Sequence, residues 1–371
     1  MKLAEAAGNP PITLDNSSHP GLLYGEQKAN MPAPSLFANP PCESPRSTSL
    51  VGIARLAAQG ESIRQGHHVE YFTLESHSLL NRVVSARRRP FQWAINPYRG
   101  CEFACKYCYA RYTHEFMELS DLDFEQKIFV KENAAWLLRQ ELNRVPRNEA
   151  IAIGTATDPY QPAERRYGVT RALLEELARH SGLRLGIVTK SDLILRDVEL
   201  LRAIREKNDF HVSITITTLD ADLARILEPR APRPDLRLKA VEQLNLAGVP
   251  AGINCAPVLP GITDAPTALE ALVEAASQAR AIYIFANPLF LKPCSAAIFL
   301  PFLEKEFPHL VEDYRRRYAE RSFLPPSYGK RLSEMIAKFR RKHGIGKKDS
   351  EASGSRKRYP VEALSEQLRL F

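Results

Sequence analysis

The chain contains 371 residues, with 51 lysines and arginines against 43 acidic residues, so its formal net charge is +8. Hydrophobic residues make up 44% and charged residues 25%, which excludes a wholly disordered or collagen-like chain. No run of about 18 apolar residues occurs, so we expect no membrane-spanning helix. The start, MKLAEAAGNPPITLDN, lacks the apolar core of a secretory signal. We therefore expect a cytoplasmic protein whose six cysteines are reduced, which favours metal ligation over disulfides.

The N-terminal segment has a different composition from the rest of the chain. Its first 50 residues hold eight of the 27 prolines and show no periodic apolar pattern. This composition predicts a largely disordered arm over residues 1–66, with a weak helical pattern at Ile53–Ala58. We place a core domain at 67–320 and a basic C-terminal helix and tail at 321–371.

Short apolar runs alternate with helical patterns through the core domain. The expected strands are Gln92–Tyr98, Ala150–Thr155, Arg184–Val188, His211–Thr217, Pro250–Pro257 and Ala281–Phe285. The expected helices are Ala134–Asn143, Thr170–His180, Arg196–Lys207, Leu236–Ala247 and Ala268–Ala279. Continuous apolar strands separated by helices predict an α/β fold with a parallel sheet, either a barrel or a doubly wound sheet. The pattern holds six strand units, fewer than the eight of a complete barrel.

The tail carries most of the net charge. Residues Lys338–Arg358 contain nine lysines and arginines and two acidic residues, a local net charge of +7. Such a run fits a solvated basic helix and linker. It also fits a nucleic-acid contact, because clustered cations release counterions from phosphates.

Three cysteines form a compact motif directly after the first expected strand. Cys101, Cys105 and Cys108 have the spacing C-x3-C-x2-C, whereas the other cysteines (Cys42, Cys255 and Cys294) form no second motif. One alternative is zinc completed by His114 or by a distant cysteine, since structural zinc takes four protein ligands. The other is an iron–sulfur cluster with three cysteine ligands and one open iron, because an ordinary cluster takes four cysteines.

At these residues the sequence resembles a known family. The run from Asn96 to Arg111, NPYRGCEFACKYCYAR, looks like the signature of radical S-adenosylmethionine (SAM) proteins, within the branch related to spore photoproduct lyase, or DNA repair photolyase-like. The resemblance covers about Val69–Tyr318. Further supporting stretches are Gly154–Pro162, Val188–Ser191, Thr217–Asp220 with Glu228–Arg230, and Ala256–Asp264.

The resemblance implies a partial (β/α)6 barrel of the radical SAM type, which agrees with the six units. It implies a [4Fe–4S] cluster on Cys101, Cys105 and Cys108, with S-adenosylmethionine chelating the open iron. One electron, from a donor such as flavodoxin or ferredoxin, would cleave the sulfonium bond, and the 5′-deoxyadenosyl radical would abstract a hydrogen from the substrate. These are properties of the family, and the protein supplies position and exclusion of water.

The resemblance also assigns residues to cofactor binding. Asp158 matches the position that holds the cofactor ammonium, although an Asp before a turn is also a common cap. Thr157 lies beside it and is a candidate for the cofactor carboxylate. Lys190 resembles the lysine that pairs with that carboxylate, although a lysine after a buried strand can simply face solvent. Ser213 on the fourth strand is a candidate for the ribose hydroxyls.

Two tyrosines and one departure concern the substrate half of the site. Tyr107 and Tyr109 flank Cys108 as matching tyrosines do in spore photoproduct lyase, so we expect a catalytic role, with packing around the cluster as the alternative. That enzyme carries a cysteine shortly before the position of Asp158, where this chain has Gly154, Thr155 and Ala156. Because a threonine O–H bond is too strong to return a hydrogen atom, repair by that route is in doubt.

We therefore predict a lyase-like radical SAM enzyme that acts on nucleic acid in DNA repair or modification. One alternative is a radical enzyme acting on a peptide or small molecule, and another is a non-enzymatic iron–sulfur protein that docks on nucleic-acid machinery.

The last five residues resemble the QLxLF peptide that bacterial replication and repair proteins insert into the sliding clamp. The matching residues are Gln367, Leu368, Leu370 and Phe371. An amide, two leucines and a terminal aromatic suit a small apolar pocket with a polar rim. The alternative is a last helical turn in which Leu364, Leu368 and Phe371 pack on the barrel.

Overall fold

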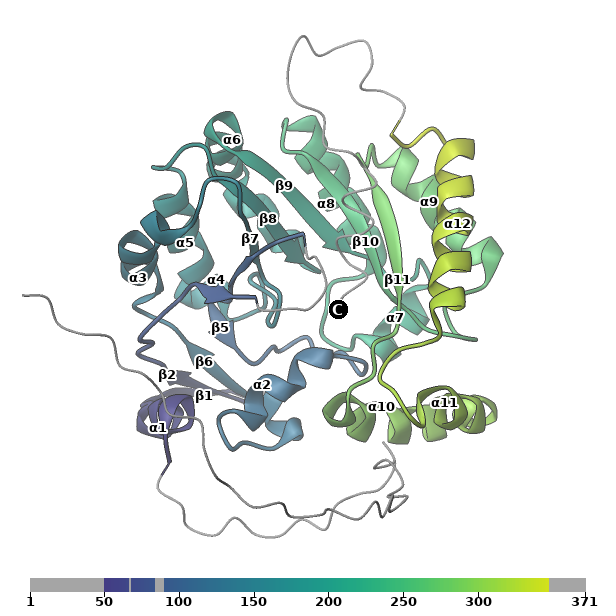
Figure 1. Cartoon of the computed structure of the whole chain (residues 1–371), viewed down its shortest axis with the longest axis horizontal. Coiled ribbons are helices and arrows are strands. Elements are labelled where there is room, and N and C mark those ends of the chain that lie inside the picture. Colours follow the sequence, from purple (N-terminus) through teal and green to yellow (C-terminus); the bar gives the residue numbers. More distant parts are fainter. Residues whose placement is uncertain (1–49, 67, 84–89, 347–371) are drawn as a thin grey trace, which may run out of the picture. The chain divides into compact units, whose positions relative to one another are not determined.

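The protein is described by a computed structural model over residues 50–66, 68–83 and 90–346. Its main element is a seven-stranded sheet with the order β11-β10-β9-β8-β7-β4-β3 (Figure 1). The strands are β3 (Asn81–Arg82), β4 (Trp93–Ile95), β7 (Ala150–Ile153), β8 (Arg184–Thr189), β9 (Asp209–Thr215), β10 (Ala251–Val258) and β11 (Ile284–Pro288). Strands β4 and β7 to β11 run parallel, and β3 pairs antiparallel with β4.

These six parallel strands are the six predicted from the sequence, and the α/β class is confirmed. Within the described residues β11 pairs only with β10 and β3 only with β4, so the sheet does not close into a complete barrel. Residues such as Ile153, Ile187, Ile214 and Ile253 are fully or almost fully buried. Strands covered on both faces need apolar side chains on both, which explains why the runs are continuous rather than alternating.

The connecting helices match the predicted helical patterns to within a few residues. They are α3 (Ala134–Glu141), α5 (Val169–Leu177), α6 (Val198–Lys207), α8 (Pro234–Leu246) and α9 (Pro266–Gln278), with the short helices α4 (Glu164–Tyr167) and α7 (Ala221–Leu227). In α5, Leu173, Leu174 and Leu177 form the buried stripe that turns the helix toward the core. Proline occupies the first position of α8 and α9, where its missing N–H leaves no bond unmade.

A second, four-stranded sheet was not predicted. It has the order β1-β2-β6-β5, with β1 (Ser62–Gly66), β2 (Val69–Thr73), β5 (Tyr98–Arg99) and β6 (Lys127–Val130). Helix α1 (Gly52–Gln59) precedes it, close to the predicted helical stretch. Strand β1 lies inside the segment that the sequence assigned to the arm, and it pairs antiparallel with β2. Strand β2 pairs with β6, which follows the cysteine motif, so only long-range pairing creates this sheet.

Three further helices follow β11 in the described chain. They are α10 (Pro293–Glu306), α11 (Val311–Tyr318) and α12 (Pro326–Lys342). Helix α12 lies along β11 and α9 (Figure 1), and it buries Leu332, Ile336 and Phe339 on its inner face. The basic segment predicted to begin at Lys338 therefore starts inside a helix that packs on the sheet.

The remaining elements are short helical segments of three to six residues. They are η1 (Tyr109–Arg111), α2 (Tyr112–Glu115), η2 (Asp121–Glu125), η3 (Leu142–Arg144), η4 (Asp192–Asp197) and η5 (Pro308–Leu310).

Several sequence predictions fall outside the described residues. They are the arm before residue 50, Cys42, the tail after residue 346, and the clamp-like peptide ending at Phe371. Within the described part of the chain, no helix combines the length and hydropathy that a membrane span requires.

Candidate active site

The cysteine motif forms a loop that leaves the short strand β5. Gly100 makes the turn into this loop with φ of 81°. A Cβ at this position would lie 2.7 Å from the carbonyl oxygen of Lys127, so only glycine fits. The Cys101 N–H donates to the Phe124 carbonyl at 2.9 Å, and the Lys106 N–H donates to the Leu227 carbonyl at 2.9 Å. The loop is thus tied to η2 on one side and to α7 on the other.

The three cysteine side chains line one pocket with the carboxyl ends of the parallel strands. Its wall is formed by residues that follow β7, by the ends of β8, β9 and β10, and by β11 with the loop after it. These residues are Cys101, Phe103, Cys105, Tyr107, Cys108, Tyr109, Ala110, Phe124, Gly154, Thr155, Ala156, Thr157, Asp158, Val188, Thr189, Lys190, Thr215, Asn254, Ala256, Pro257, Asn287, Pro288, Leu289 and Phe290. We call it the cysteine pocket. Barrel enzymes hold their active sites at this end of the strands.

Gly154 allows the loop after β7 to enter the pocket. Its φ is 88°, and a Cβ there would lie 2.5 Å from the Pro159 side chain and 2.6 Å from the Val188 carbonyl oxygen. The predicted residues Thr157 and Asp158 follow on the same loop, and both are buried.

Asp158 lines the pocket and also ties strand ends together. Its Oδ1 accepts from the Thr189 hydroxyl at 2.6 Å and from the Tyr160 N–H at 2.9 Å, and its Oδ2 accepts from the Lys190 N–H at 2.7 Å. Burial raises the pKa of Asp158, although these three hydrogen bonds oppose the rise. Asp158 therefore caps the turn, as the alternative in the sequence analysis proposed, and it also lines the pocket.

Thr157 and Gln161 hold the cysteine loop against the loop after β7. The Thr157 hydroxyl donates to the Gly100 carbonyl at 2.6 Å. The Gln161 amide donates to that carbonyl at 3.2 Å and to the Thr157 hydroxyl at 3.0 Å, and its oxygen accepts from the Glu102 N–H at 2.9 Å. Gln161 is fully buried. Its three bonds make it a positioning residue that the sequence analysis did not single out.

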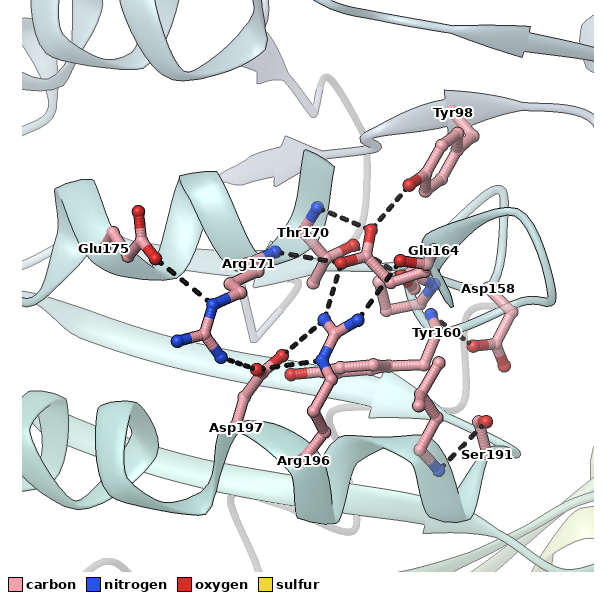
Figure 2. A network of polar contacts seen from close by, with 12 residues as sticks. Tyr98, Asp158, Tyr160, Glu164, Thr170, Arg171, Glu175, Ser191, Arg196 and Asp197 are labelled. Carbon is pink, nitrogen blue, oxygen red and sulfur yellow. Dashed lines mark hydrogen bonds and ion pairs between the residues drawn. The ribbon is translucent and has the colours of Figure 1, made fainter. Parts of the chain in front are cut away.

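A buried ionic network supports this loop from behind (Figure 2). The Glu164 carboxylate, fully buried, accepts from the Tyr98 hydroxyl at 2.5 Å and from the Thr170 N–H at 2.7 Å. It also accepts from Arg196 at 2.8 Å, and Arg196 in turn bonds Asp197 at 2.8 Å. Because Tyr98 precedes the Gly100 turn, the network fixes where β5 ends and the cysteine loop starts.

Lys190 lies in the pocket together with Asp158 and the cysteines. Its Nζ is 5.7 Å from the centroid of the Tyr107 ring. Burial by itself lowers the pKa of Lys190, but the neighbouring Cys105 and Glu228 outweigh it, so the pKa is raised and the side chain is a cation. Lys190 is half-buried and lines the pocket.

Tyr107 is buried, and its hydroxyl donates to the Glu228 carboxylate. Glu228 forms an ion pair at 2.5 Å with Arg237, and both side chains are almost completely buried. Burial raises the pKa of Glu228, but Arg237 and Lys190 outweigh this effect and hold it below its usual range. The sequence analysis quoted Glu228 only as part of a family stretch and did not see this pair.

Tyr109 and Phe290 line the pocket and form an aromatic cluster with Tyr112, which we call the aromatic rim. The Tyr109 hydroxyl donates to the Thr155 carbonyl, and its ring lies 6.2 Å from Phe290 and 6.4 Å from Tyr112. The Lys292 ammonium lies 3.7 Å from the centre of the Tyr112 ring. Tyr107 is therefore buried and bonded to Glu228, whereas Tyr109 is half-buried and belongs to the aromatic rim.

The structure does not bring Ser213 into the cysteine pocket. Its hydroxyl bonds that of Tyr283 at 2.6 Å, one layer below the strand ends. Thr215, two residues further along β9, lines the pocket instead. Side chains two residues apart on a strand point to the same face, so Ser213 and Thr215 share a face of β9. Ser213 lies further than Thr215 from the strand end that lines the pocket.

The other described cysteines stay out of the pocket wall. Cys255 is fully buried in the main core, and Cys294 is 4% exposed with its thiol against the Tyr109 carbonyl. Neither is among the lining residues. This agrees with the interpretation of both as small buried residues, and the described wall offers no thiol beyond the triad.

The geometry of the triad does not suit a single metal ion. Two thiolates bound 2.3 Å from one tetrahedral ion lie about 3.8 Å apart. Among described residues, the group of potential ligands within 4.8 Å of one another is Glu115, Asp121 and Cys294, and not the triad. The His114 ring, the zinc ligand considered from the sequence, instead bonds the Lys127 carbonyl at 3.2 Å. The three triad sulfurs are therefore not all within 4.8 Å of one another, which leaves room for a group larger than one ion.

Further pocket residues fit a polar ligand. Asn254 Oδ1 and Asn287 Nδ2 are buried and lack a hydrogen-bond partner within the described structure, and both residues line the pocket. Unmet donors and acceptors of this kind are costly unless a bound molecule satisfies them. Each asparagine lies near the end of an apolar strand, and this position could have identified it from the sequence. The sequence analysis selected Ser213 on a strand but neither asparagine.

Burial raises the pKa of all three triad thiols, to about 12 for Cys105. Lys190 opposes the rise at Cys105 and Cys108. Thiols in such a place become thiolates when a metal coordinates them.

Comparison with known proteins agrees with this site. Residues 95–272 match the Radical SAM superfamily, a range that contains the triad, Asp158 and Lys190. Uncharacterised proteins of Mycobacterium tuberculosis and Mycobacterium bovis are 37% identical over 262 residues, 70% of this chain and 77% of theirs. An uncharacterised protein of Methanocaldococcus jannaschii is 27% identical over 233 residues, 63% of this chain and 83% of its own.

Among solved structures, a cysteine-to-serine mutant of spore photoproduct lyase superposes with a TM-score of 0.56 at 17% identity, covering 74% of this chain and 80% of that one. Another mutant of that enzyme, with bound AdoMet and dinucleoside spore photoproduct, gives a TM-score of 0.53 at 17% identity over 71% and 77%. At this identity the likeness concerns the fold.

Proposed function

The chain belongs to the radical SAM superfamily and is an enzyme, and from this premise we propose that it cleaves S-adenosylmethionine at a [4Fe–4S] cluster held by Cys101, Cys105 and Cys108. The observation that carries the proposal is that these cysteines, Asp158 and Lys190 line one pocket at the carboxyl ends of parallel strands. When bound, the cluster and cofactor supply a 5′-deoxyadenosyl radical that takes a hydrogen atom from the substrate.

The residues of this chain bind and orient the cofactor. The Lys190 ammonium would pair with the cofactor carboxylate, because it is a half-buried cation that lines the pocket. The Asp158 carboxylate would accept from the cofactor ammonium, and it accepts from the Lys190 backbone N–H. Thr215, Asn254 and Asn287 are placed for polar contacts to the cofactor or substrate. Phe103, Phe124 and Ala110 exclude water from the wall.

We propose nucleic acid as the substrate class, in DNA repair or modification. The support is the fold shared with spore photoproduct lyase, one structure of which holds a dinucleoside spore photoproduct, together with the aromatic rim of the pocket. The absence of a thiol at Gly154–Ala156 argues for a different hydrogen return from the one expected in that enzyme. A peptide or small-molecule substrate is the alternative. Family membership removes the non-enzymatic alternative.

Anaerobic reconstitution with iron, sulfide and a reductant tests the proposal. We expect 5′-deoxyadenosine from S-adenosylmethionine, and deuterium in that product when deuterated DNA is present. Transfer from a deuterated protein extract instead of from DNA would assign the alternative. Formation of no 5′-deoxyadenosine by a protein that binds four irons would contradict the radical chemistry itself.

Partners follow from the same proposal. A one-electron donor of the flavodoxin or ferredoxin kind, in the cytoplasm, would reduce the cluster. The peptide with Gln367, Leu368, Leu370 and Phe371 would deliver the enzyme to DNA through a sliding clamp. Titration of the Val361–Phe371 peptide with a bacterial clamp should give a Kd in the micromolar range, because a short peptide loses entropy when it orders. Absence of binding at about 100 μM, or binding that survives Leu370→Ala with Phe371→Ala, would end this part.

A further inference from the structure

A second cavity, which we call the cationic cavity, lies between β11 and α12 and has a volume of about 870 Å³. It shares Asn287, Pro288 and Leu289 with the cysteine pocket, so the two are neighbours across the end of β11. Helix α12 lies beside β11, the edge strand of the sheet (Figure 1).

The charged side chains that line this cavity all carry the same sign. They are Arg321, Lys330, Arg340 and Arg341, and no acidic residue belongs to the lining. Within the described chain Arg321, Arg340 and Arg341 form no ion pair, and Lys330 only approaches the exposed Glu334, at 3.9 Å. Four cations around one hollow repel one another, and an anion placed among them removes that repulsion.

Arg340 is the lining cation that most needs an anionic partner. Its Nε is buried and has no hydrogen-bond partner in the described structure. Burial lowers the pKa of Arg340 and the neighbouring Arg341 lowers it further, so its charge is desolvated without compensation. A phosphate oxygen would supply both the acceptor and the opposite charge.

Two stacked aromatic rings lie where the two cavities meet. Phe290 lines the cysteine pocket and Phe323 lines the cationic cavity, and their ring centroids are 4.3 Å apart with an angle of 17° between the planes. Phe323 is 42% exposed, which is unusual for a phenylalanine. An exposed ring face next to a row of cations is the arrangement with which proteins bind unpaired nucleic-acid strands, because bases stack on the ring and phosphates bind the cations.

We propose that the cationic cavity and the Phe290–Phe323 pair bind the backbone and a base of an unpaired nucleic-acid strand that enters the cysteine pocket. This inference rests on the proposed function for the identity of the reacting site. It adds the location of the strand, the residues that hold it, and the requirement that the strand be unpaired there.

The test is the binding of a fluorescein-labelled oligothymidylate of about 15 nucleotides, a length within the range of single-strand sites. Fluorescence anisotropy is measured with the full chain, without reductant, over a range of salt concentrations. Arg340→Gln with Arg341→Gln should weaken binding about tenfold. The slope of log K against log salt should become less negative by about 1.4, because two phosphate contacts are lost. Phe323→Ala should weaken binding by a similar factor with the slope unchanged.

A matched control comes from the same helix. Arg331 and Lys338 are exposed on α12 and do not line the cavity, so Arg331→Gln with Lys338→Gln removes the same charge from a neighbouring surface. If the Arg340 pair fails to fold, Arg321→Gln with Lys330→Gln removes two exposed lining cations instead. Equal losses in cavity and control variants, or tighter binding of the matched duplex than of the single strand, would overturn the proposal.

The outcome can be separated from that of the proposed function. Production of 5′-deoxyadenosine without substrate is measured on the same variants, and the cavity variants should retain it. Loss of strand binding with this activity retained supports the cavity. If wild-type protein makes no 5′-deoxyadenosine but strand binding still depends on the cavity residues, the proposed function fails while the cavity assignment stands.

Discussion

The Tyr107 hydroxyl donates a hydrogen bond to the Glu228 carboxylate, which joins the residue before Cys108 to the end of α7. Arg237 from α8 neutralises that carboxylate through an ion pair at 2.5 Å. The position of the cysteine loop therefore depends on a buried ion pair that comes from much later in the chain.

Removing the Glu228 charge should destabilise the protein more than removing the Tyr107 hydroxyl. Glu228→Gln leaves Arg237 buried without a counter-charge, at a cost of about 3–5 kcal/mol. Tyr107→Phe removes one hydrogen bond to a charged group, at a cost of about 1.5–3 kcal/mol. Urea unfolding of the apoprotein measures both. The control Glu199→Gln breaks an exposed pair with Arg202 and should cost less than about 0.5 kcal/mol. A Glu228→Gln protein as stable as this control would contradict the structural role of the pair.

The triad cysteines should carry the iron, and the other described cysteines should not. Cys101→Ala, Cys105→Ala and Cys108→Ala should each abolish the brown absorption and the roughly four irons per chain after anaerobic reconstitution. Cys255→Ala and Cys294→Ala should keep both, because neither thiol lines the pocket. Stoichiometric zinc in a colourless wild-type protein would refute the cluster.

Asp158→Asn and Lys190→Met should weaken S-adenosylmethionine binding while the iron content stays unchanged. Each change removes a charge-assisted hydrogen bond of about 1.5–3 kcal/mol, so affinity should fall about tenfold or more. Asparagine is chosen because it keeps an acceptor for the Lys190 N–H. Equilibrium binding to the reconstituted protein is the measurement, and Lys239→Met, an exposed lysine on α8, is the control. Wild-type affinity in both site variants would make these residues structural.

Gln161→Leu should loosen the cysteine loop without touching the metal ligands. The Glu102 N–H loses its partner, and a buried group left unpaired costs about 1–3 kcal/mol. The Gly100 carbonyl keeps only its bond from the Thr157 hydroxyl. We expect the reconstituted variant to lose iron faster than wild type during exposure to a chelator. Gln243→Leu, on the exposed face of α8, serves for comparison. Equal rates of iron loss in the two variants would argue against the positioning role.

The contribution of His114 to the free energy of unfolding should fall as the pH drops from about 6.5 to about 4. Burial lowers the pKa of His114 to about 4, whereas an unfolded histidine titrates near 6.5. Between about pH 6.5 and about pH 4 the histidine is protonated in the unfolded chain but neutral in the folded one. The free energy of unfolding therefore falls by about 1.4 kcal/mol for each pH unit from this group. Urea unfolding of the apoprotein at several pH values checks it. His114→Gln should flatten the slope but not remove it, because burial also lowers the pKa of His211 to about 4. An unchanged slope would be inconsistent with a neutral buried His114.

Much of the architecture could be predicted because its signals are local. Apolar runs such as Arg184–Thr189 and the buried stripe of α5 define six strand–helix units, since strand and helix periodicity are properties of short windows. The spacing of Cys101, Cys105 and Cys108 indicated a metal site for the same reason. Asp158 and Lys190 came from the family resemblance, and both lie at strand ends, where parallel topology gathers side chains at one edge.

What only the tertiary structure decided is which distant residues meet. The sheet formed by β1, β2, β6 and β5, the Gln161 bonds to the cysteine loop, and the Tyr107–Glu228–Arg237 chain join segments with no shared local pattern. The sequence also does not show how far along a strand the pocket begins. Ser213 was therefore selected, whereas Thr215 lines the pocket. Burial makes these contacts energetically important. A charge or amide that water solvates at the surface needs a specific partner in the interior. The sequence by itself determined the six strand–helix units and the cysteine motif. The three-dimensional packing decided the wall of the cysteine pocket, and with it the cationic cavity beside β11.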